Sequence, residues 1–317
     1  MYQLMFAIIT PALIVGAIAE RMKYSALMLF MVGWMFLVYF PLAHMVWGID
    51  GFMNGVWNAN ASIKAIDFAG GTVVHMTSGW SAIVLALILG KRKGFGKRTS
   101  RRTAWCSPWS APACCGSAGT ASTPAARSRA DGVAANAFTT TTLAAAVAGA
   151  AWPALEWITR GKPTVLGFCS GIVGGLVVIT PAAGFVTASG ASSSACSLAS
   201  FRSSPCTKLK QMLGYDDALD TFGVHGVGGT FGAFVTGIFA TPDMNANLDT
   251  NLKGSSEAAV ARAAQGDGLH GCPQPGGTVV LAYAIKAVMG LRPTLEDEET
   301  GLDLSDHGEK GYHLGET

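Results

Sequence analysis

The sequence has 317 residues, of which 13% are charged and 50% are hydrophobic, and its formal net charge is +2. Soluble domains carry roughly 25% charged residues, because a folded surface in water needs them, so this composition excludes an ordinary soluble protein. The 40 glycines favour closely packed transmembrane helices, and the sequence lacks the alternating ten-residue segments of a β-barrel. Seven scattered cysteines without CxxC spacing indicate neither a disulfide framework nor a zinc site. We therefore expect an all-α polytopic membrane protein.

Seven apolar segments follow one another along the chain. A spanning helix needs about 20 mainly apolar residues. Six segments approach or exceed this length and the last is shorter: 3–19, 25–47, 68–90, 133–157, 164–187, 219–241 and 276–291. Because apolar sequence begins almost directly after Met1, we expect the first helices of the parent protein to be lacking here. The polar and acidic residues 292–317 predict a cytoplasmic tail that follows a membrane domain at 1–291.

Lysine and arginine give the expected orientation, because they concentrate in cytoplasmic loops. They cluster at 21–23, 91–97, 160–162 and 208–210, whereas the loops 48–66 and 242–275 contain few. An even number of spans must separate two cytoplasmic clusters. Only 133–157 lies between the second and third clusters, and only 164–187 lies between the third and fourth. Each of these two intervals therefore requires a second span.

Two unusual segments occupy these intervals. Residues 98–131 and 191–206 are rich in Ser, Pro, Arg and Cys, and an arginine at a helix centre costs about 2.5–3.5 kcal/mol. Their abrupt boundaries favour the hypothesis that 98–129 and 191–205 are translated in the wrong reading frame. The alternative, that they are ordinary polar loops, leaves two basic clusters on the wrong side of the membrane.

Two glycine-rich spans each contain one histidine. His75 follows Asp67 by eight residues, which is about 12 Å along a helix, so His75 lies near the middle of the membrane if Asp67 lies near its surface. His225 follows Asp220 in a similar setting. Ionisable residues at this depth are functional candidates, and the alternative is a neutral histidine bonded to a neighbouring helix. A metal site needs a third ligand, and His44 lies near a membrane edge, so we expect no metal.

Trp47 and Asp67 each have a structural alternative. Trp47 ends its span on the non-cytoplasmic side, where tryptophan is common as an interfacial anchor, and its functional interpretation is a cation–π platform. Asp67 is either a helix cap, a functional carboxylate, or both. The spacing of Gly228 and Gly232 allows close approach of a neighbouring helix.

Several long segments resemble the ammonium transporter family. They are DFAGGTVVH (67–75), DTFGVHGVGGT (220–230), AERMKYSAL (19–27), AHMVWG (43–48), ADGVAANAFTTTTLAAA (130–146) and GFCSGIVGGLVVITPAAGFV (167–186). The acidic residues 293–314 are also similar to the C-terminal region of that family. The resemblance covers most of the chain outside 98–131, 191–206 and a stretch at 254–276.

The resemblance implies a fold of eleven transmembrane helices in two inverted five-helix halves, incomplete in this chain, and a homotrimer with one pore in each subunit. It implies that His75 and His225 share a hydrogen bond across the pore, that Trp47 belongs to an aromatic cage for ammonium, and that Asp67 favours the cation there. Ammonium would be recruited and deprotonated, and ammonia conducted, since a bare cation in hydrocarbon is prohibitive. We expect no enzymatic activity, no cofactor and no nucleic-acid partner.

The chain departs from the family at its pore gate. One gate phenylalanine belongs in or beside the part expected before Met1. The second belongs in the pattern W-V-G-W-Y-G-F-N-A-G-S, where this chain has CGSAGTASTPAARSRAD (115–131). A one-base displacement of suitable codons for G-F-N-A-G-S-A-V reads A-S-T-P-A-A-R-S, and A-V-I-I-G similarly reads A-S-S-S-A. We therefore expect an incomplete pore and impaired folding; the stretch 254–276 has no such explanation.

The sequence thus predicts a multi-pass protein of the cell membrane that transports ammonium or ammonia. The alternatives are an ammonium sensor, which an additional soluble signalling domain would distinguish, and a non-functional fragment of a transporter. The acidic run 296–299 is the place where a PII-type signalling protein would contact the cytoplasmic face, and its alternative is a solvated tail. A membrane enzyme would need a nucleophile or a metal set beside the histidines, and the sequence offers none.

Overall fold

The computed structural model describes residues 2–95, 107–201, 210, 212–252 and 274–309. Within these ranges there is no strand, only an isolated bridge between Asn54 and Ala65. The helical elements in chain order are α1 (Tyr2–Ile18), α2 (Tyr24–Trp34), η1 (Met35–Tyr39), α3 (Phe40–Trp47), η2 (Gly71–Met76), α4 (Thr77–Leu89), α5 (Ser107–Ala125), α6 (Gly132–Arg160), α7 (Val165–Ile179), α8 (Ala188–Phe201), η4 (Phe222–Val227), α10 (Gly228–Phe239), α11 (Asn247–Leu252), α13 (Gln274–Met289), α14 (Leu295–Thr300) and α15 (Leu302–Ser305).

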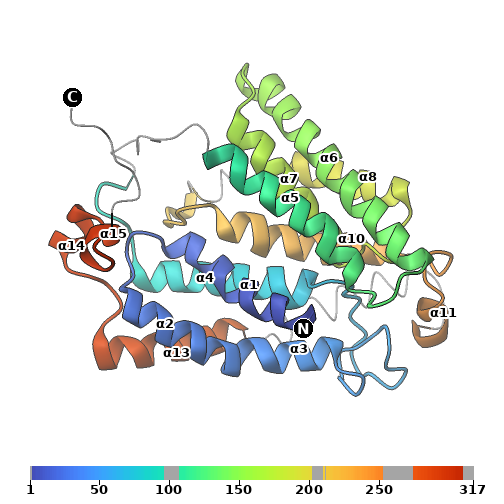
Figure 1. Cartoon of the computed structure of the whole chain (residues 1–317), viewed down its shortest axis with the longest axis horizontal. Helices are drawn as coiled ribbons and strands as arrows, with labels where there is room; N and C mark the ends of the chain where they lie inside the picture. The colour runs from blue at the N-terminus through green and yellow to red at the C-terminus, as the bar shows by residue number, and fades with distance from the viewer. Residues whose placement is uncertain (1, 96–106, 202–209, 211, 253–273, 310–317) are drawn as a thin grey trace.

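Four continuous helices are long and apolar enough to cross a membrane. They are Tyr24–Trp47, Gly71–Leu89, Gly132–Arg160 and Phe222–Phe239, and each matches an expected span. Three shorter apolar helices, α1, α7 and α13, correspond to the remaining expected segments. Figure 1 shows most of these helices running roughly along one direction. The expectation of an all-α polytopic membrane fold is confirmed.

The expected span 164–187 is too long, and the structure corrects it. α7 starts after Thr164, whose side chain accepts a hydrogen bond from the Gly167 N–H, and it ends at Ile179. Pro181 lacks the N–H that a continuing helix would need. Residues 180–186 instead form a buried turn whose carbonyls at Thr180 and Pro181 accept the N–H groups of Ala69 and Phe68. This turn therefore supports the segment that leads into η2.

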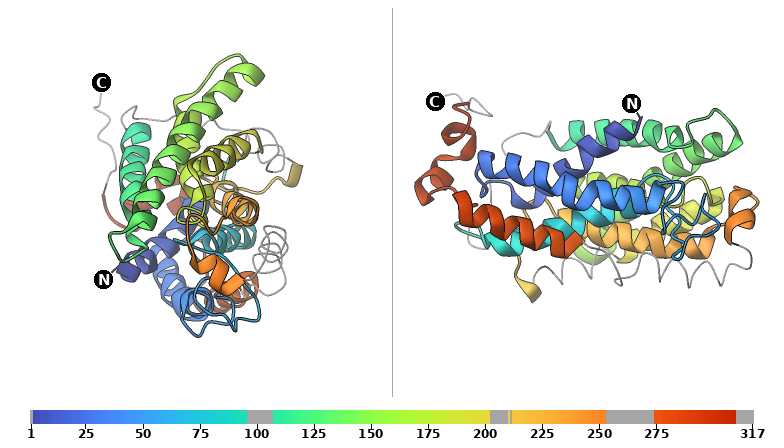
Figure 2. Two further views of the ribbon diagram at one scale, coloured as in Figure 1. Left: turned by 90° about the vertical axis from the view of Figure 1, so that its right-hand side faces the viewer. Right: turned by 90° about the horizontal axis from the view of Figure 1, so that it is seen from below.

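The two apolar clusters with the most buried residues each join several helices. One joins α1, α2, α3, α4 and α13, and the other joins α6, α7 and α8; Figures 1 and 2 show the corresponding helix groups side by side. A buried polar contact reinforces the first cluster. Trp34 Nε1 donates to Ser81 Oγ at 3.0 Å and to Thr278 Oγ1 at 3.2 Å, so α2, α4 and α13 are fixed to one another.

The unusual segments form helices in the structure. α5 lies against α6 and α7, and α8 lies against α6, α7 and α10 (Figure 1). Each interval between basic clusters therefore contains a second helix, although neither α5 nor α8 is among the four helices that meet the length and hydropathy of a span. The expectations for 98–106, 202–205 and 254–273 fall outside the described residues.

Serines on the exposed face of α8 allow a test of how much the polar residues of this segment destabilise the protein in a bilayer. Ser193 and Ser197 are exposed, whereas Ser194 is buried and donates to the Gly190 carbonyl at 2.8 Å. Replacing both Ser193 and Ser197 by leucine is expected to stabilise the protein in a bilayer, since each leucine at mid-depth contributes roughly 0.3–0.6 kcal/mol. The thermal midpoint in lipid nanodiscs should rise. Ser194→Leu is the matched control and should lower the midpoint through overpacking; equal effects at the three positions would contradict the assignment of faces.

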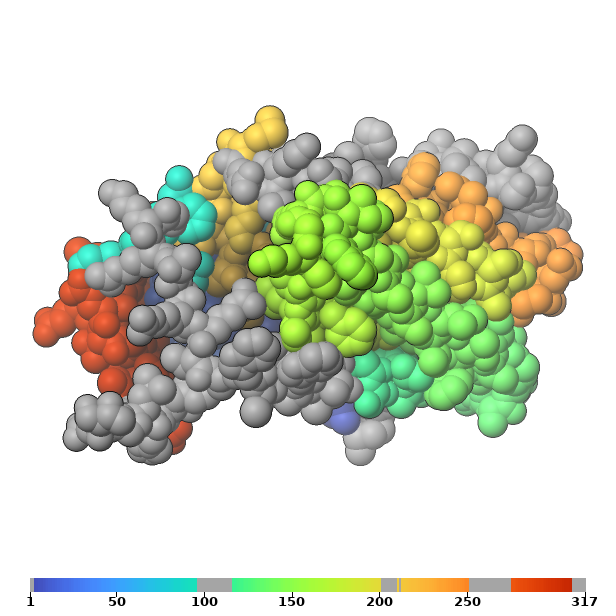
Figure 3. Space-filling view, turned by 90° about the horizontal axis from the view of Figure 1, so that it is seen from above, coloured from blue at the N-terminus to red at the C-terminus, as the bar shows by residue number. Residues whose placement is uncertain are grey.

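Charged residues gather at one end of the helices. Arg21 and Asp216 are both fully buried and form an ion pair at 2.9 Å, and Arg92 binds Asp216 and Glu20. The tail returns to the same end, where Arg292 pairs with Glu298 and the Tyr24 N–H donates to Asp306. Figure 3 shows α14 and α15 at this end and α11 at the opposite end. The structure thus places Arg21, Arg92 and the tail at the same end of the helices.

Candidate functional site

The two histidines meet where the helices η2–α4 and η4–α10 cross. His75 and His225 each lie in a π-helical turn, a feature that often marks functional sites. The two helices approach closely because glycines line the crossing: a Cβ at Gly79 would overlap the backbone of Gly226, and one at Gly229 would lie 3.0 Å from His75 Cβ. The structure therefore brings together the two histidines that the sequence singled out.

The contact between the histidines is a hydrogen bond. His75 Nδ1 and His225 Nδ1 are 3.0 Å apart, and the ring centroids lie 5.1 Å apart with an interplanar angle of 21°. Thr180 Oγ1 lies 3.3 Å from His75 Nε2 and donates its only proton to the Leu176 carbonyl at 2.6 Å. Since that hydroxyl can then only accept, the arrangement favours the tautomer in which His75 carries its proton on Nε2 and its bare Nδ1 accepts from His225 Nδ1–H. Sequence reasoning did not single out Thr180.

Asp67 is a cap whose oxygens are fully engaged. Its Oδ1 accepts the N–H groups of Gly70 and Gly71 at 2.7 Å, and its Oδ2 accepts those of Thr72 and Val73 at 2.9 and 3.0 Å. Burial raises the pKa of this carboxyl, while the four N–H donors oppose the rise by stabilising the carboxylate. The capping role is therefore observed, and it engages both carboxylate oxygens.

Asp217, rather than Asp220, is the counterpart of Asp67 in the other half. Asp217 stands eight residues before His225, as Asp67 stands before His75. Its carboxylate accepts the N–H groups of Thr221 and Phe222 at 2.9 and 2.7 Å. Asp220 instead forms an ion pair with Lys210 at 2.5 Å. The repeated eight-residue spacing was visible in the sequence and identifies the correct aspartate.

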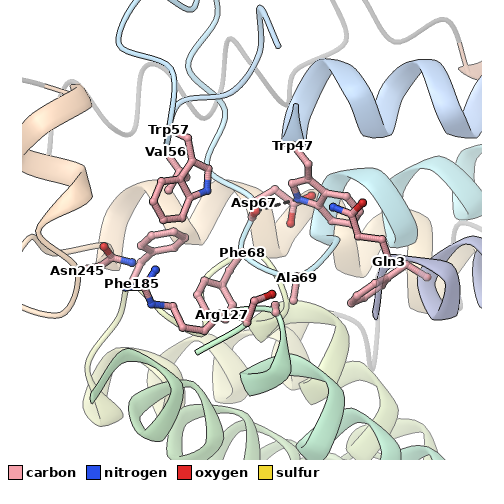
Figure 4. Close-up of a pocket in the computed structure, with 13 residues that line it drawn as sticks. Gln3, Trp47, Val56, Trp57, Asp67, Phe68, Ala69, Arg127, Phe185 and Asn245 are labelled. Carbon is pink, nitrogen blue, oxygen red and sulfur yellow. Dashed lines mark hydrogen bonds between the residues drawn. The ribbon is translucent and has the colours of Figure 1, made fainter. Parts of the chain in front are cut away.

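Trp47 and Asp67 line one cavity of about 390 Å³. Trp47 Nε1 donates to the Asp67 carbonyl at 3.1 Å, and the ring of Phe6 meets the Trp47 ring edge-on at 5.6 Å. Figure 4 shows the cavity between the loop that carries Trp57 and the helices below it. Its lining is rich in aromatic side chains and also includes Arg127 and Asn245. The structure thus places Trp47 and Asp67 in one cavity and the two histidines at a separate contact. Phe6 also lines the cavity, and the sequence analysis did not name it.

Comparisons with known proteins agree with the fold. The family model described as Ammonium Transporter Family matches residues 1–111 and 116–312. A Bacillus subtilis protein named ammonium transporter is 41% identical over 98% of this chain, and an Aquifex aeolicus protein of the same name is 42% identical over 99%. The crystal structure of Saccharomyces cerevisiae Mep2 is similar over 93% of the chain with a TM-score of 0.80 and 31% identity.

The chain spans only part of these relatives. It covers 75% of the Bacillus subtilis protein, 71% of the Aquifex aeolicus protein and 66% of the Mep2 chain. A structure described as a sensor Amt protein has a TM-score of 0.82 but 24% identity, so it supports the fold alone. The apolar helices and the relatives identify a multi-pass protein of the cell membrane that resembles transporters and not enzymes. The chain belongs to the ammonium transporter family.

Proposed function

We propose that this chain conducts ammonia derived from ammonium past the paired histidines. Ammonium is recruited in the cavity beside Trp47 and loses a proton there. Ammonia then enters the membrane, and the proton follows a related route past His75 and His225. The observation that carries the proposal is the 3.0 Å contact between His75 and His225. The pair supports a hydrogen-bonding site for ammonia between two otherwise apolar helices, because neutral imidazoles both donate and accept hydrogen bonds.

The entrance favours a cation for two physical reasons. The faces of Trp47 and Phe6 attract cations through their ring quadrupoles. Asp67 contributes through its charge at a distance, because its oxygens are bonded to four backbone N–H groups. A cation that reached the apolar interior would lose its hydration, so deprotonation at the entrance lowers the barrier.

We also propose that the membrane domain 1–291 assembles as a homotrimer and that the tail 292–317 offers its acidic run to a PII-type signalling protein. Large apolar side chains exposed on α2, η1 and α3, such as Phe36 and Val32, suit lipid or a second subunit.

The reading-frame hypothesis for 98–129 and 191–205 remains a proposal. Polar and charged residues in these segments are expected to destabilise the fold in the membrane and so to lower the amount of folded protein. Transport is therefore compared for equal amounts of folded chain.

Histidine variants test the proposed path. His75→Ala and His225→Ala are expected to change methylammonium uptake, or the current that accompanies it, by at least about tenfold, since groups that move protons contribute roughly 10²–10⁴ in rate. Uptake is measured in cells without other ammonium transporters. His44→Ala is the matched control, because His44 is largely exposed and contacts only Asp50 among the ion pairs of the described chain. Unchanged uptake and current in both central variants would refute the role of the pair.

A further inference from the structure

The entrance cavity contains a cation that belongs to the chain itself. Arg127 lies just after α5 and lines the cavity that Trp47, Asp67 and Trp57 also line. Its guanidinium carbon is 5.9 Å from the centroid of the Trp57 ring. Figure 4 shows its side chain extending beneath Trp57 toward Phe185 and Asn245. The positive group therefore sits on the aromatic lining of the cavity.

The position of Arg127 is fixed by a second contact. Its Nε donates to Asp131 Oδ2 at 2.9 Å, and the two side chains are only 20% and 27% exposed. Asp131 is itself held as the cap of α6, because its Oδ1 accepts the Ala134 N–H at 3.1 Å. A carboxylate and an aromatic face together form a good site for a small organic cation. In this chain the guanidinium fills that site.

Arg127 also acts on any cation beside Trp47. The guanidinium is a fixed positive charge in the same cavity. Asp131 compensates part of this charge, and we expect the remainder to lower the affinity for a second cation roughly three- to tenfold at the effective dielectric of a partly open site. This effect is screened at high salt, because the Debye length falls from about 10 Å at 0.1 M to about 3 Å at 1 M. The negative charge of Asp67 favours ammonium in the cavity, and the positive charge of Arg127 therefore opposes it.

We propose that Arg127 is an intramolecular competitor that occupies the Trp57 side of the cavity and sets a low affinity of this cavity for ammonium and for small organic cations. Its place in the mechanism rests on the proposed ammonium recruitment, whereas its occupation of the cation subsite does not. Arg127 lies within 115–131, the segment in which the sequence analysis expects a departure from the family's gate pattern.

Direct binding of guanidinium ion tests the competition without requiring transport. The purified chain in lipid nanodiscs is titrated with radiolabelled guanidinium at low salt, and bound ligand is counted at equilibrium. Arg127→Gln is expected to bind guanidinium roughly three- to tenfold more tightly than the unchanged chain. The gain should shrink as sodium chloride rises to 1 M, and it should disappear when Trp57→Leu is added to Arg127→Gln.

Two matched variants distinguish the effect of a charge inside the cavity from that of a charge on the surface. Arg127→Lys keeps the charge and should retain most of the competition. Arg129→Gln removes an equal charge from an exposed neighbour that is not among the residues lining the cavity and should leave the affinity unchanged. A gain for Arg129→Gln equal to that of Arg127→Gln, or no gain for a folded Arg127→Gln, overturns the proposal. Arg127→Met repeats the test if the glutamine variant does not fold.

The outcomes also separate this inference from the proposed function. Methylammonium competes with guanidinium for the vacated site if the entrance recruits ammonium, and the proposed function predicts this competition. A variant that gains guanidinium binding while the histidine variants leave uptake unchanged supports the competitor and refutes the path. The reverse result refutes the competitor and leaves the path intact.

Discussion

Replacing Asp67 by alanine is expected to destabilise the protein by about 3 kcal/mol or more. The variant leaves the N–H groups of Gly70, Gly71, Thr72 and Val73 without their acceptor, and each buried donor without a partner costs roughly 1–3 kcal/mol. Gly70 adds to the constraint, since it holds φ at +107°, a conformation that suits glycine. The first turn of η2 should lose its geometry, and the position of His75 with it.

Thermal unfolding of purified variants in nanodiscs measures this effect. Asp67→Asn is expected to lie between the wild type and Asp67→Ala, because an amide has one acceptor oxygen and its NH₂ group faces N–H donors. Asp50→Ala is the matched control, since the Asp50 side chain is 83% exposed on a neighbouring loop. The capping role is wrong if Asp67→Ala and Asp50→Ala unfold at the same temperature as the wild type.

Adding one methyl group at Gly79 is expected to have the second large effect. A Cβ there would overlap the backbone of Gly226, which cannot move aside as a flexible side chain could. The two helices must separate, and overpacking of this kind costs roughly 1–3 kcal/mol or more. The separation lengthens the contact between His75 and His225, so uptake should fall together with stability.

Gly276→Ala is the matched control for Gly79→Ala. Gly276 lies in α13, and a Cβ at this position meets no atom within 4 Å. Alanine is the better helix former by roughly 1 kcal/mol, so this variant should be neutral or more stable. Both variants are compared by thermal midpoint and by methylammonium uptake for equal amounts of folded protein. Equal midpoints would show that the crossing is not close-packed.

Hydropathy and length predicted most of the helices, because a bilayer imposes the same requirement on each span. The depth of His75 in the membrane stays a prediction. The hydrogen bond between His75 and His225 was implied by the family resemblance, and the structure contains it. The end of α7 was misjudged because residues 180–186 are apolar, and an apolar run does not reveal whether it is a helix or a buried turn.

Contacts between distant segments were beyond the sequence. Thr180 is an ordinary residue in an apolar stretch until the fold places it beside His75. Asp220 was the wrong partner for His225, although the eight-residue spacing of Asp67 and His75 already indicated Asp217, and the hydrogen bonds of Asp217 to the backbone establish the difference. The sequence analysis considered the segment of Arg127 only for the free energy of placing arginine in a membrane span. Its position in the cavity comes from the fold alone. Such assignments depend on tertiary geometry that one sequence does not encode in any local pattern.

If protons follow the proposed path, the hydrogen bonds of Thr180 and of the histidine pair give this path a direction. A proton that binds His225 Nε2 displaces the Nδ1 proton onto His75 Nδ1, and His75 releases its own Nε2 proton. One such passage reverses the tautomers of both rings. A second proton cannot follow in the same direction until both imidazoles have turned or exchanged their protons. Any such current therefore requires ring reorientation or proton exchange at the glycine crossing between one passage and the next.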